Sequence, residues 1–258
     1  MTRADTFRAL HDDFLLLPNA WDAASAAALV RAGFPAVATT SLGVAAGAGL
    51  RDGTGVSRAE TVALAGRLAG LPVPVSVDVE GGFGADSRGD HADDPGAVRD
   101  LGHELAALGV AGVNIEDGRE NSGLVDPAHQ ARLVAAIGES GLFVNARTDT
   151  YWLGVDRDST LDRVRAYVDA GADGVFVPGM VADADIQALV EAVPVPVNLL
   201  FMPENLTVGR LRALGVRRVS TGSLLFRAAL GAALEVAGAV RDGEPLRRDI
   251  PAVQEIQG

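Results

Sequence analysis

The sequence contains no cysteine, few aromatic residues and no excess of basic charge. Without cysteine the chain can form no disulfide, no thiolate nucleophile and no zinc–thiolate site. Its net charge of −12 disfavours nucleic-acid and anionic-membrane partners, because both require a basic face. No uninterrupted apolar stretch approaches the ~20 residues of a membrane span, and residues 1–10 lack the apolar segment of a signal peptide. We therefore expect a soluble cytoplasmic protein with no nucleic-acid or membrane partner.

The composition that remains favours a large α/β core. Hydrophobic residues make up 48% of the chain and aromatic residues only 5%, so small aliphatic side chains can pack helices closely on a sheet. A length of 258 residues allows two small domains or one α/β barrel. Because no linker or low-complexity stretch divides the chain, we expect one domain over residues 1–258, with a C-terminal helix and tail from about residue 223.

Short β-rich segments alternate along the chain with helix-length segments rich in alanine and leucine. The expected strands are 14–18, 36–39, 73–78, 112–116, 142–147, 174–177, 195–200 and 218–221. The expected helices are 23–32, 58–69, 95–108, 127–139, 160–170, 182–192, 207–214 and 223–241. Eight strand–helix units in series predict an α/β fold of the (β/α)8 TIM-barrel type rather than an open doubly wound sheet.

Acidic residues gather at the ends of consecutive predicted strands. Asp78 and Glu80 are two residues apart, which on a strand places both on one face, about 7 Å from each other. Glu116 ends the next expected strand, and Arg147 ends the one after it. Since burying an unpaired carboxylate costs several kcal/mol, a bound divalent cation is the simplest explanation. Oxygen-only ligands favour Mg²⁺ or Mn²⁺ over zinc, and Arg147 can bind a carboxylate or phosphonate in a bidentate pair.

Polar and aromatic residues at the ends of the predicted strands also have purely structural explanations when each is taken alone. Asp22 and Asp117 could be helix N-caps, Arg147 could do no more than neutralise Glu116, and Trp21 could serve packing. What such explanations do not cover is three acids and an arginine on successive strands. The histidines show no ligand spacing and are expected on the solvated surface. They are His11, His91, His103 and His129.

Six short segments resemble motifs of the isocitrate lyase and phosphoenolpyruvate mutase superfamily, and the likeness extends from residue 16 to about residue 237. Residues 18–26 are similar to the family's first-strand motif, and residues 39–46 are similar to its loop that binds an α-keto acid through backbone amides and a hydroxyl. Residues 77–84 are similar to the metal motif, with glutamate in place of the second aspartate. The other three segments are 49–52, 115–117 and 146–149.

The resemblance implies a set of site residues. A Mg²⁺ (or Mn²⁺) cofactor would be held by Asp78, Glu80 and Glu116. Asp52 would act in proton transfer, with Arg147 as the second catalytic residue. The implied substrate-binding residues are Trp21, Thr40, Ser41, Leu42, Asn121 and Arg147.

The resemblance also implies the reaction type and the assembly. Members of the superfamily stabilise the enolate of a pyruvate-like acid and break a C–C or P–C bond next to it. Their C-terminal helix is swapped between subunits in a dimer of dimers. The expected helix 223–241 fits such a role, because it is apolar on more than one face and one barrel wall cannot cover it. The implied substrate is a small anion, either a 2-oxo or 2-hydroxy carboxylate or a phosphonate.

The loop at residues 118–124 departs from the family motifs. Isocitrate and methylisocitrate lyases carry a cysteine there, and the mutase and phosphonopyruvate hydrolase carry a lysine; this chain has neither. Residues 177–180 also lack the histidine or glutamate common in those relatives. We therefore expect a Mg²⁺-dependent lyase acting on a small 2-oxo or 2-hydroxy acid, for example in oxaloacetate decarboxylation. Two alternatives remain open: P–C chemistry, as in the mutase or the hydrolase, and a non-catalytic 2-oxo-acid-binding protein.

Overall fold

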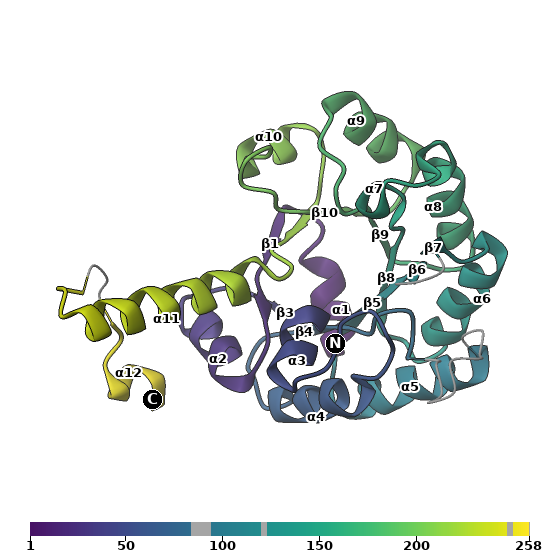
Figure 1. Cartoon of the computed structure of the whole chain (residues 1–258). Helices are drawn as coiled ribbons and strands as arrows, with labels where there is room; N and C mark the ends of the chain where they lie inside the picture. The colour runs from purple at the N-terminus through teal and green to yellow at the C-terminus, as the bar shows by residue number, and fades with distance from the viewer. Residues whose placement is uncertain (84–93, 120–122, 247–249, 258) are drawn as a thin grey trace.

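The computed structural model describes residues 1–83, 94–119, 123–246 and 250–257, and its centre is a ring of parallel strands (Figure 1). The strands are β1 (Leu15–Leu17), β2 (Asn19–Ala20), β3 (Val37–Thr39), β4 (Val75–Asp78), β5 (Gly112–Glu116), β8 (Phe143–Arg147), β9 (Gly174–Phe176), β10 (Val197–Leu200) and β11 (Arg218–Ser220). Their order in the sheet is β1-β11-β10-β9-β8-β5-β4-β3-β2.

The ring is closed by the first strand, which Pro18 interrupts. On one side of the break β1 pairs with β11, and on the other side β2 pairs with β3. Proline has no N–H to donate to a ladder, so a break at this position is expected. Asn19 holds the break together: its Oδ1 accepts hydrogen bonds from the backbone N–H groups of Thr221 and Gly222, both at 2.9 Å, and its Nδ2 donates to the Thr39 carbonyl at 2.7 Å.

Helices surround the ring. They are α1 (Arg3–Ala9), α2 (Ala23–Arg31), α3 (Ser41–Gly47), α4 (Arg58–Leu68), α5 (Pro95–Ala107), α6 (Pro127–Gly138), α7 (Thr150–Leu153), α8 (Thr160–Asp169), α9 (Asp183–Ala192), α10 (Val208–Ala213), α11 (Leu224–Asp242) and α12 (Val253–Gln257). A short hairpin, β6 (Gly118–Arg119) and β7 (Gly123–Leu124), follows β5. The predicted TIM-barrel fold is confirmed, with the expected strands and helices in their expected order. The sequence patterns did not predict α1, α3, α7, α12 or the hairpin, because segments this short show little periodicity.

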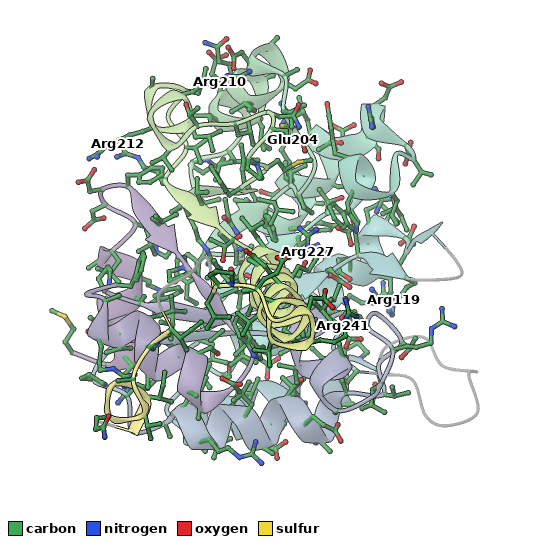
Figure 2. The ribbon with its side chains drawn as sticks, turned by 60° about the vertical axis from the view of Figure 1, so that its left-hand side comes forward. Arg119, Glu204, Arg210, Arg212, Arg227 and Arg241 are labelled. Atoms are coloured by element: carbon green, nitrogen blue, oxygen red, sulfur yellow. The ribbon has the colours of Figure 1, made fainter. Side chains whose placement is uncertain are left out.

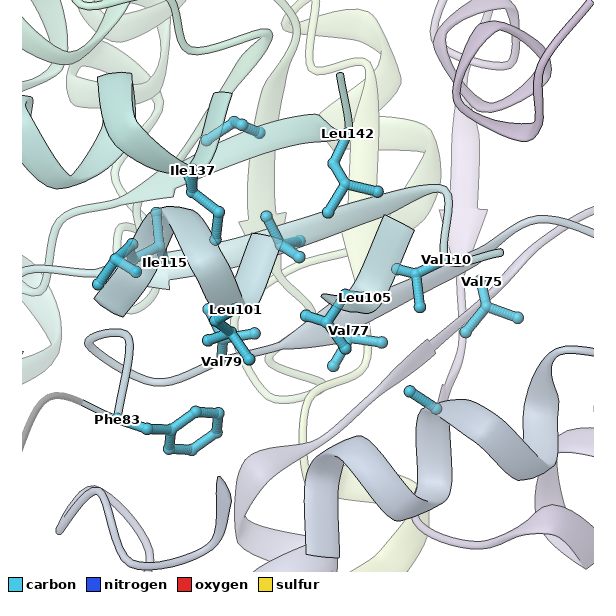
Figure 3. Packing of buried hydrophobic residues seen from close by; sticks show 14 of the residues in the cluster. Val75, Val77, Val79, Phe83, Leu101, Leu105, Val110, Ile115, Ile137 and Leu142 are labelled. Atoms are coloured by element: carbon cyan, nitrogen blue, oxygen red, sulfur yellow. The ribbon is translucent and has the colours of Figure 1, made fainter. Parts of the chain in front are cut away.

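The barrel strands are buried on both faces, since helices cover them from outside. Figure 3 shows part of this packing, in which Leu101 and Leu105 of α5 lie against Val77 and Val79 of the β4 region. Ile137 of α6 joins the same cluster. These contacts fix the strands whose carboxyl ends carry the acidic residues.

The first helix closes the amino end of the barrel. Phe7 of α1 is fully buried and meets the ring of Phe143 edge to face, with ring centroids 5.3 Å apart. His11 stacks flat on Phe143 at 4.4 Å, and its Nδ1 lies 2.8 Å from the Phe7 carbonyl oxygen. The expectation that all histidines lie on the solvated surface is therefore wrong for His11, which is only 4% exposed. Burial lowers the pKa of His11 to about 3, so the ring is neutral. Of the other histidines, His103 is exposed, His129 is partly buried and His91 lies outside the described residues.

The last long helix leaves the barrel. Figure 1 shows α11 projecting away from the ring, with α12 near its far end. Phe226 is the one buried residue of the helix, whereas Leu230, Leu234 and Val240 are 51%, 75% and 69% exposed. No helix in the described part of the chain is both long enough and apolar enough to cross a membrane.

Candidate active site

A small cavity lies at the carboxyl ends of the barrel strands, where the catalytic residues of such barrels are found. Its volume is about 100 Å³. Six of the residues expected to form the site line it together: Thr40, Ser41, Leu42, Asp52, Asp78 and Arg147. They come from the N-cap and first turn of α3, from the segment that follows α3, and from the ends of β4 and β8. The fold thus brings together residues more than a hundred positions apart in the sequence.

Two residues expected to bind substrate are not part of this group. Trp21 lines a separate hollow between α2, α3 and α4, and its ring meets that of Phe226 with centroids 5.6 Å apart. Asn121 lies outside the described residues. Their roles in binding stay predictions.

Arg147 stands between two carboxylates. Its Nη1 lies 2.7 Å from an oxygen of Glu116, and its Nε lies 2.7 Å from an oxygen of Asp149. Burial alone would lower the pKa of Arg147, but these two carboxylates raise it above its ordinary value. Neutralising Glu116 is therefore one function of this arginine. It is compatible with ligand binding, because Nη2 makes neither of these contacts.

Asp78 is buried and lines the cavity. Its hydrogen-bond partners are the Ser41 hydroxyl and, at 3.4 Å, the backbone N–H of Glu80. Burial raises the pKa of Asp78; the Arg147 charge counteracts this rise, and the nearby Asp52 adds to it. Burial likewise raises the pKa of Glu116 well above its usual value, with Arg147 again opposing. The site is a cluster of carboxylates that disfavour one another's charge.

Glu80 is held in a different way from Asp78. Its backbone is in the left-handed region, with φ of 50°, which is uncommon for a non-glycine residue. Its side chain accepts a hydrogen bond from the Ser57 hydroxyl at 2.6 Å and another from the Gly55 backbone N–H at 2.8 Å. Burial raises the pKa of Glu80, and those two hydrogen bonds oppose the rise. Glu80 therefore fastens the segment that follows Asp52 to the end of β4.

The acidic cluster suits a hard divalent cation. All its donors are oxygen atoms, which Mg²⁺ and Mn²⁺ prefer. Burial and, to a smaller extent, the neighbouring carboxylates raise the pKa values of these groups, and a bound cation would favour their charged forms. Among the described residues, no three acidic or histidine side chains are grouped closely enough to hold a metal ion between them. Because Mg²⁺ usually keeps several of its waters, one direct protein ligand with further carboxylates acting through water fits this arrangement.

Several residues of the site were missed by the sequence reasoning, among them Asn114 and Arg218. Asn114 lines the cavity from β5, and its Oδ1 accepts hydrogen bonds from Arg218 Nη2 at 3.1 Å and from Asn145 Nδ2 at 2.9 Å. One signal was available for Asn114: it precedes Glu116 by two residues on a strand and so shares its inward face. No sequence signal indicated Arg218, because it lies 104 positions along the chain from Asn114.

Asp117 and Asp22 have structural roles. Asp117 is fully buried, and its oxygens accept hydrogen bonds from the Tyr167 hydroxyl at 2.6 Å and from the Asp149 backbone N–H at 2.9 Å. It orders the backbone beside Arg147 instead of capping a helix. Asp22 is the N-cap of α2, where it accepts a hydrogen bond from the Ser25 N–H at 2.7 Å.

Comparisons with known proteins agree with this architecture. The family model described as phosphoenolpyruvate phosphomutase matches residues 7–241. An uncharacterised protein of Mycobacterium tuberculosis (strain ATCC 25618 / H37Rv) is 46% identical over 240 residues, covering 92% of this chain and 88% of that protein. Oxaloacetate decarboxylase of Bradyrhizobium sp. (strain BTAi1 / ATCC BAA-1182) is 31% identical over 183 residues, which are 66% of this chain and 60% of the decarboxylase.

A solved structure extends the comparison to a ligand-bound relative. Phosphonopyruvate hydrolase in complex with oxalate and Mg²⁺ has a TM-score of 0.84 and 25% sequence identity, and the alignment covers 99% of this chain and 94% of that chain. The family model covers nearly the whole barrel, which confirms the resemblance stated from the sequence motifs. This chain therefore belongs to the phosphoenolpyruvate phosphomutase family, within the isocitrate lyase and phosphoenolpyruvate mutase superfamily of lyases and mutases.

Proposed function

We propose that the protein is a Mg²⁺-dependent lyase that acts on a small 2-oxo or 2-hydroxy acid and breaks the C–C bond next to the pyruvate-like enolate that forms. Decarboxylation of oxaloacetate is one concrete instance. The observation that carries the proposal is the cavity of about 100 Å³, which is lined by Asp52 and Asp78, by Arg147 and by the start of α3. Glu116 is paired with Arg147, and neither Glu80 nor Glu116 lines the cavity itself. A space of this size suits the 2-oxo-acid head of a substrate.

The metal would be held mainly by Asp78. Glu80 and Glu116 would act through metal-bound waters, since Glu80 is fastened to Ser57 and Gly55 while Glu116 is paired with Arg147. When bound, Mg²⁺ would supply Lewis-acid stabilisation of the negative charge that develops on the substrate oxygen during bond cleavage. Mn²⁺ offers the same oxygen preference.

The substrate carboxylate would bind at the start of α3. Thr40 is the N-cap of this helix, and its hydroxyl makes no capping hydrogen bond. The backbone N–H groups of Ser41 and Leu42 belong to the first turn, where helix geometry provides no carbonyl acceptor for them. These groups can therefore donate to a carboxylate. Arg147 would orient a second anionic group through Nη2, and Asp52, which lines the same cavity, would transfer a proton if one is required.

The amino-acid composition also limits the mechanism. Every one of the 22 basic residues is an arginine, so the chain has no lysine side chain to form a Schiff base with a 2-oxo acid. Electrophilic assistance to C–C cleavage must then come from a metal ion or from hydrogen-bond donors. The same absence weighs against the P–C chemistry of relatives whose loop carries a lysine.

A turnover screen tests the proposal. Purified protein with Mg²⁺ is given oxaloacetate, 2-hydroxy diacids and phosphonopyruvate, while CO₂, 2-oxo acids, phosphate and phosphoenolpyruvate are measured. We expect C–C cleavage that chelation by EDTA abolishes. Release of phosphate or formation of phosphoenolpyruvate from phosphonopyruvate would favour the P–C alternative. Tight oxalate binding with no turnover of any keto acid would favour a non-catalytic binding protein.

A further inference from the structure

A second hollow lies beside the catalytic cavity. Its volume is about 290 Å³, and it is bounded by α7, by the segment that follows β10 and by the start of α11. Trp152, Leu200 and Ser223 line both hollows. The two spaces therefore meet along these three side chains, and a ligand held in the catalytic cavity can extend into the second hollow, which we call the side groove.

Apolar side chains line both spaces. Phe176 and Pro178 are among those of the catalytic cavity. The uncharged polar residues of the groove are Asn205, Thr221 and Ser223. Within the groove the apolar lining residues are Trp152, Leu200, Phe201, Met202, Pro203 and Leu224. Trp152 is 54% exposed, although a large aromatic residue usually gains most by burial. An apolar ligand group lying on it would remove that surface from water.

The charges of the side groove are balanced. Arg227 on α11 and Glu204 after β10 both line it, and Figure 2 labels the two side chains. Both are exposed and carry opposite charges, so the groove presents no unbalanced charge to a ligand. Asp52, Asp78 and Arg147, in contrast, line the catalytic cavity. Charge recognition and apolar contact are thus separated in space.

We infer that the natural substrate carries an uncharged, apolar side arm that extends from its 2-oxo-acid head into the side groove. This inference rests on the proposed function and adds the class of substrate to it. For decarboxylation the balanced reaction would be R–CH(COO⁻)–CO–COO⁻ + H⁺ → R–CH₂–CO–COO⁻ + CO₂, where R is the apolar arm. The C–C bond to the departing carboxylate breaks, and the carbon left behind takes up the proton.

Binding of product-like acids tests the inference without relying on turnover. Pyruvate, 2-oxopentanoate and 2-oxoheptanoate are titrated against the Mg²⁺-loaded protein by calorimetry, in competition with oxalate. Each methylene removed from water should tighten binding about fourfold. The affinity should therefore rise from pyruvate to 2-oxopentanoate by about tenfold or more.

Two variants and one control test whether the gain in affinity with chain length comes from the side groove. Trp152→Ala and Leu200→Ala should abolish most of the chain-length dependence, measured for each variant as the ratio of its affinity for 2-oxopentanoate to its affinity for pyruvate. Leu153→Ala is the matched control, because Leu153 is the next residue of α7, is 41% exposed and is not among the residues that line either hollow. The Leu153→Ala protein should keep the full dependence of affinity on chain length. Turnover of 3-alkyl oxaloacetates should follow the same order in kcat/KM.

The possible results separate the inference from the proposed function. If oxalate and pyruvate bind but affinity does not rise with chain length in the wild-type protein, the inference is overturned and the lyase proposal stands. If neither oxalate nor any 2-oxo acid binds in the presence of Mg²⁺, the proposed function itself fails.

Discussion

The candidate site buries several carboxylates close together, which is energetically unfavourable unless their charges are offset. Arg147 offsets Glu116 and Asp149 by direct contact. Asp78 has no such ion pair within the described residues, and its pKa is raised by burial and by the charge of Asp52. At neutral pH this part of the site gains most from a bound cation. Single-residue changes should therefore affect metal binding very unequally.

Replacing Asp78 should remove most of the metal affinity. Loss of a residue that only supports a metal ligand typically costs 10–100-fold, so Asp78→Ala should weaken Mg²⁺ binding and turnover by more than about a hundredfold. Calorimetric titration with Mg²⁺ and a steady-state assay measure the two effects. Asp162→Ala, on the exposed surface of α8, is the control. Near-wild-type metal affinity and turnover in Asp78→Ala would show that the metal site is assigned incorrectly.

Asn114 should donate a hydrogen bond to the substrate. Arginine cannot accept a hydrogen bond, so the Asn114 atom that faces Arg218 must be its oxygen, and the NH₂ group is what remains for the cavity. Asn114→Asp replaces that donor with an acceptor and places a carboxylate beside the buried arginine. Oxalate affinity at saturating Mg²⁺ should fall by about tenfold or more, while thermal stability is kept or increased.

Asn198→Asp provides the matched control for this change. Asn198 pairs in register with Arg218 on the neighbouring strand and is fully buried, yet it does not line the cavity. This variant should add a carboxylate near Arg218 without changing oxalate affinity appreciably. A parallel loss of stability and of oxalate affinity in Asn114→Asp would indicate a structural role for Asn114 instead.

At the level of elements, two short segments stabilise the two ends of the barrel. The helix α1 closes the amino end through Phe7 and His11, and the segment after α3 is fastened to the end of β4 through Glu80. Neither contact is visible as periodicity, yet both have measurable consequences.

Buried His11 should make the protein less stable in mild acid. Its pKa is about 3 in the folded state, whereas an unburied histidine has a pKa of 6.5, so protonation favours unfolding. The stabilising effect of the neutral ring is complete above pH ~6.5 and decreases as the pH falls towards 3, by at most about 1.4 kcal/mol per pH unit. His11→Phe should lose this part of the pH dependence. Urea unfolding between pH 7 and pH 4 measures it, with His103→Gln as control. Identical pH slopes for wild type and His11→Phe would contradict the prediction.

The Glu80 contacts should protect the segment that contains Asp52. In Glu80→Ala the hydrogen bonds to Gly55 and Ser57 are lost, so the segment should open more often and trypsin should cleave after Arg51 faster, by about tenfold or more. The measurement is made in EDTA, which separates this role from any role in metal binding. Glu139→Ala, at the end of α6 and away from the site, is the control. An unchanged cleavage rate would mean that Glu80 does not hold this segment.

The molecule as a whole leaves one large apolar surface without a cover among the described residues. The helix α11 extends from the barrel with Leu230, Leu234 and Val240 exposed (Figure 1). Exposed apolar area of this kind, gathered on one helix, is typical of a protein–protein interface. We propose that α11 packs against a second copy of the chain, in line with the swapped C-terminal helix expected from the family resemblance.

Light scattering should therefore show an oligomer at micromolar concentration. Leu234→Glu should shift the protein towards the monomer, because it places a charge in the proposed interface, whereas Val155→Glu, at an exposed apolar residue after α7, should not. A wild-type protein that runs as a monomer of 26.5 kDa would exclude the swap.

Much of the architecture was determined by the sequence alone, because the signals that predict it are local. Strands and helices alternate with their own hydrophobic periods, and the strands β4, β5 and β8 each end at a charged residue. Parallel strands in a barrel have their carboxyl ends at the same face. The sequence alone therefore predicts that Asp78, Glu116 and Arg147 lie close together.

Only the tertiary structure decided how these side chains are used. The positive φ of Glu80 directs its carboxylate to Gly55 and Ser57, and the arginine that orients Asn114 comes from a distant part of the chain. Trp21, which belongs to a family-like motif, lines a different hollow from the catalytic residues. His11 is buried because an aromatic ring from a distant strand lies flat against it. Such contacts depend on distances across the folded barrel, and spacing along the chain carries no information about them.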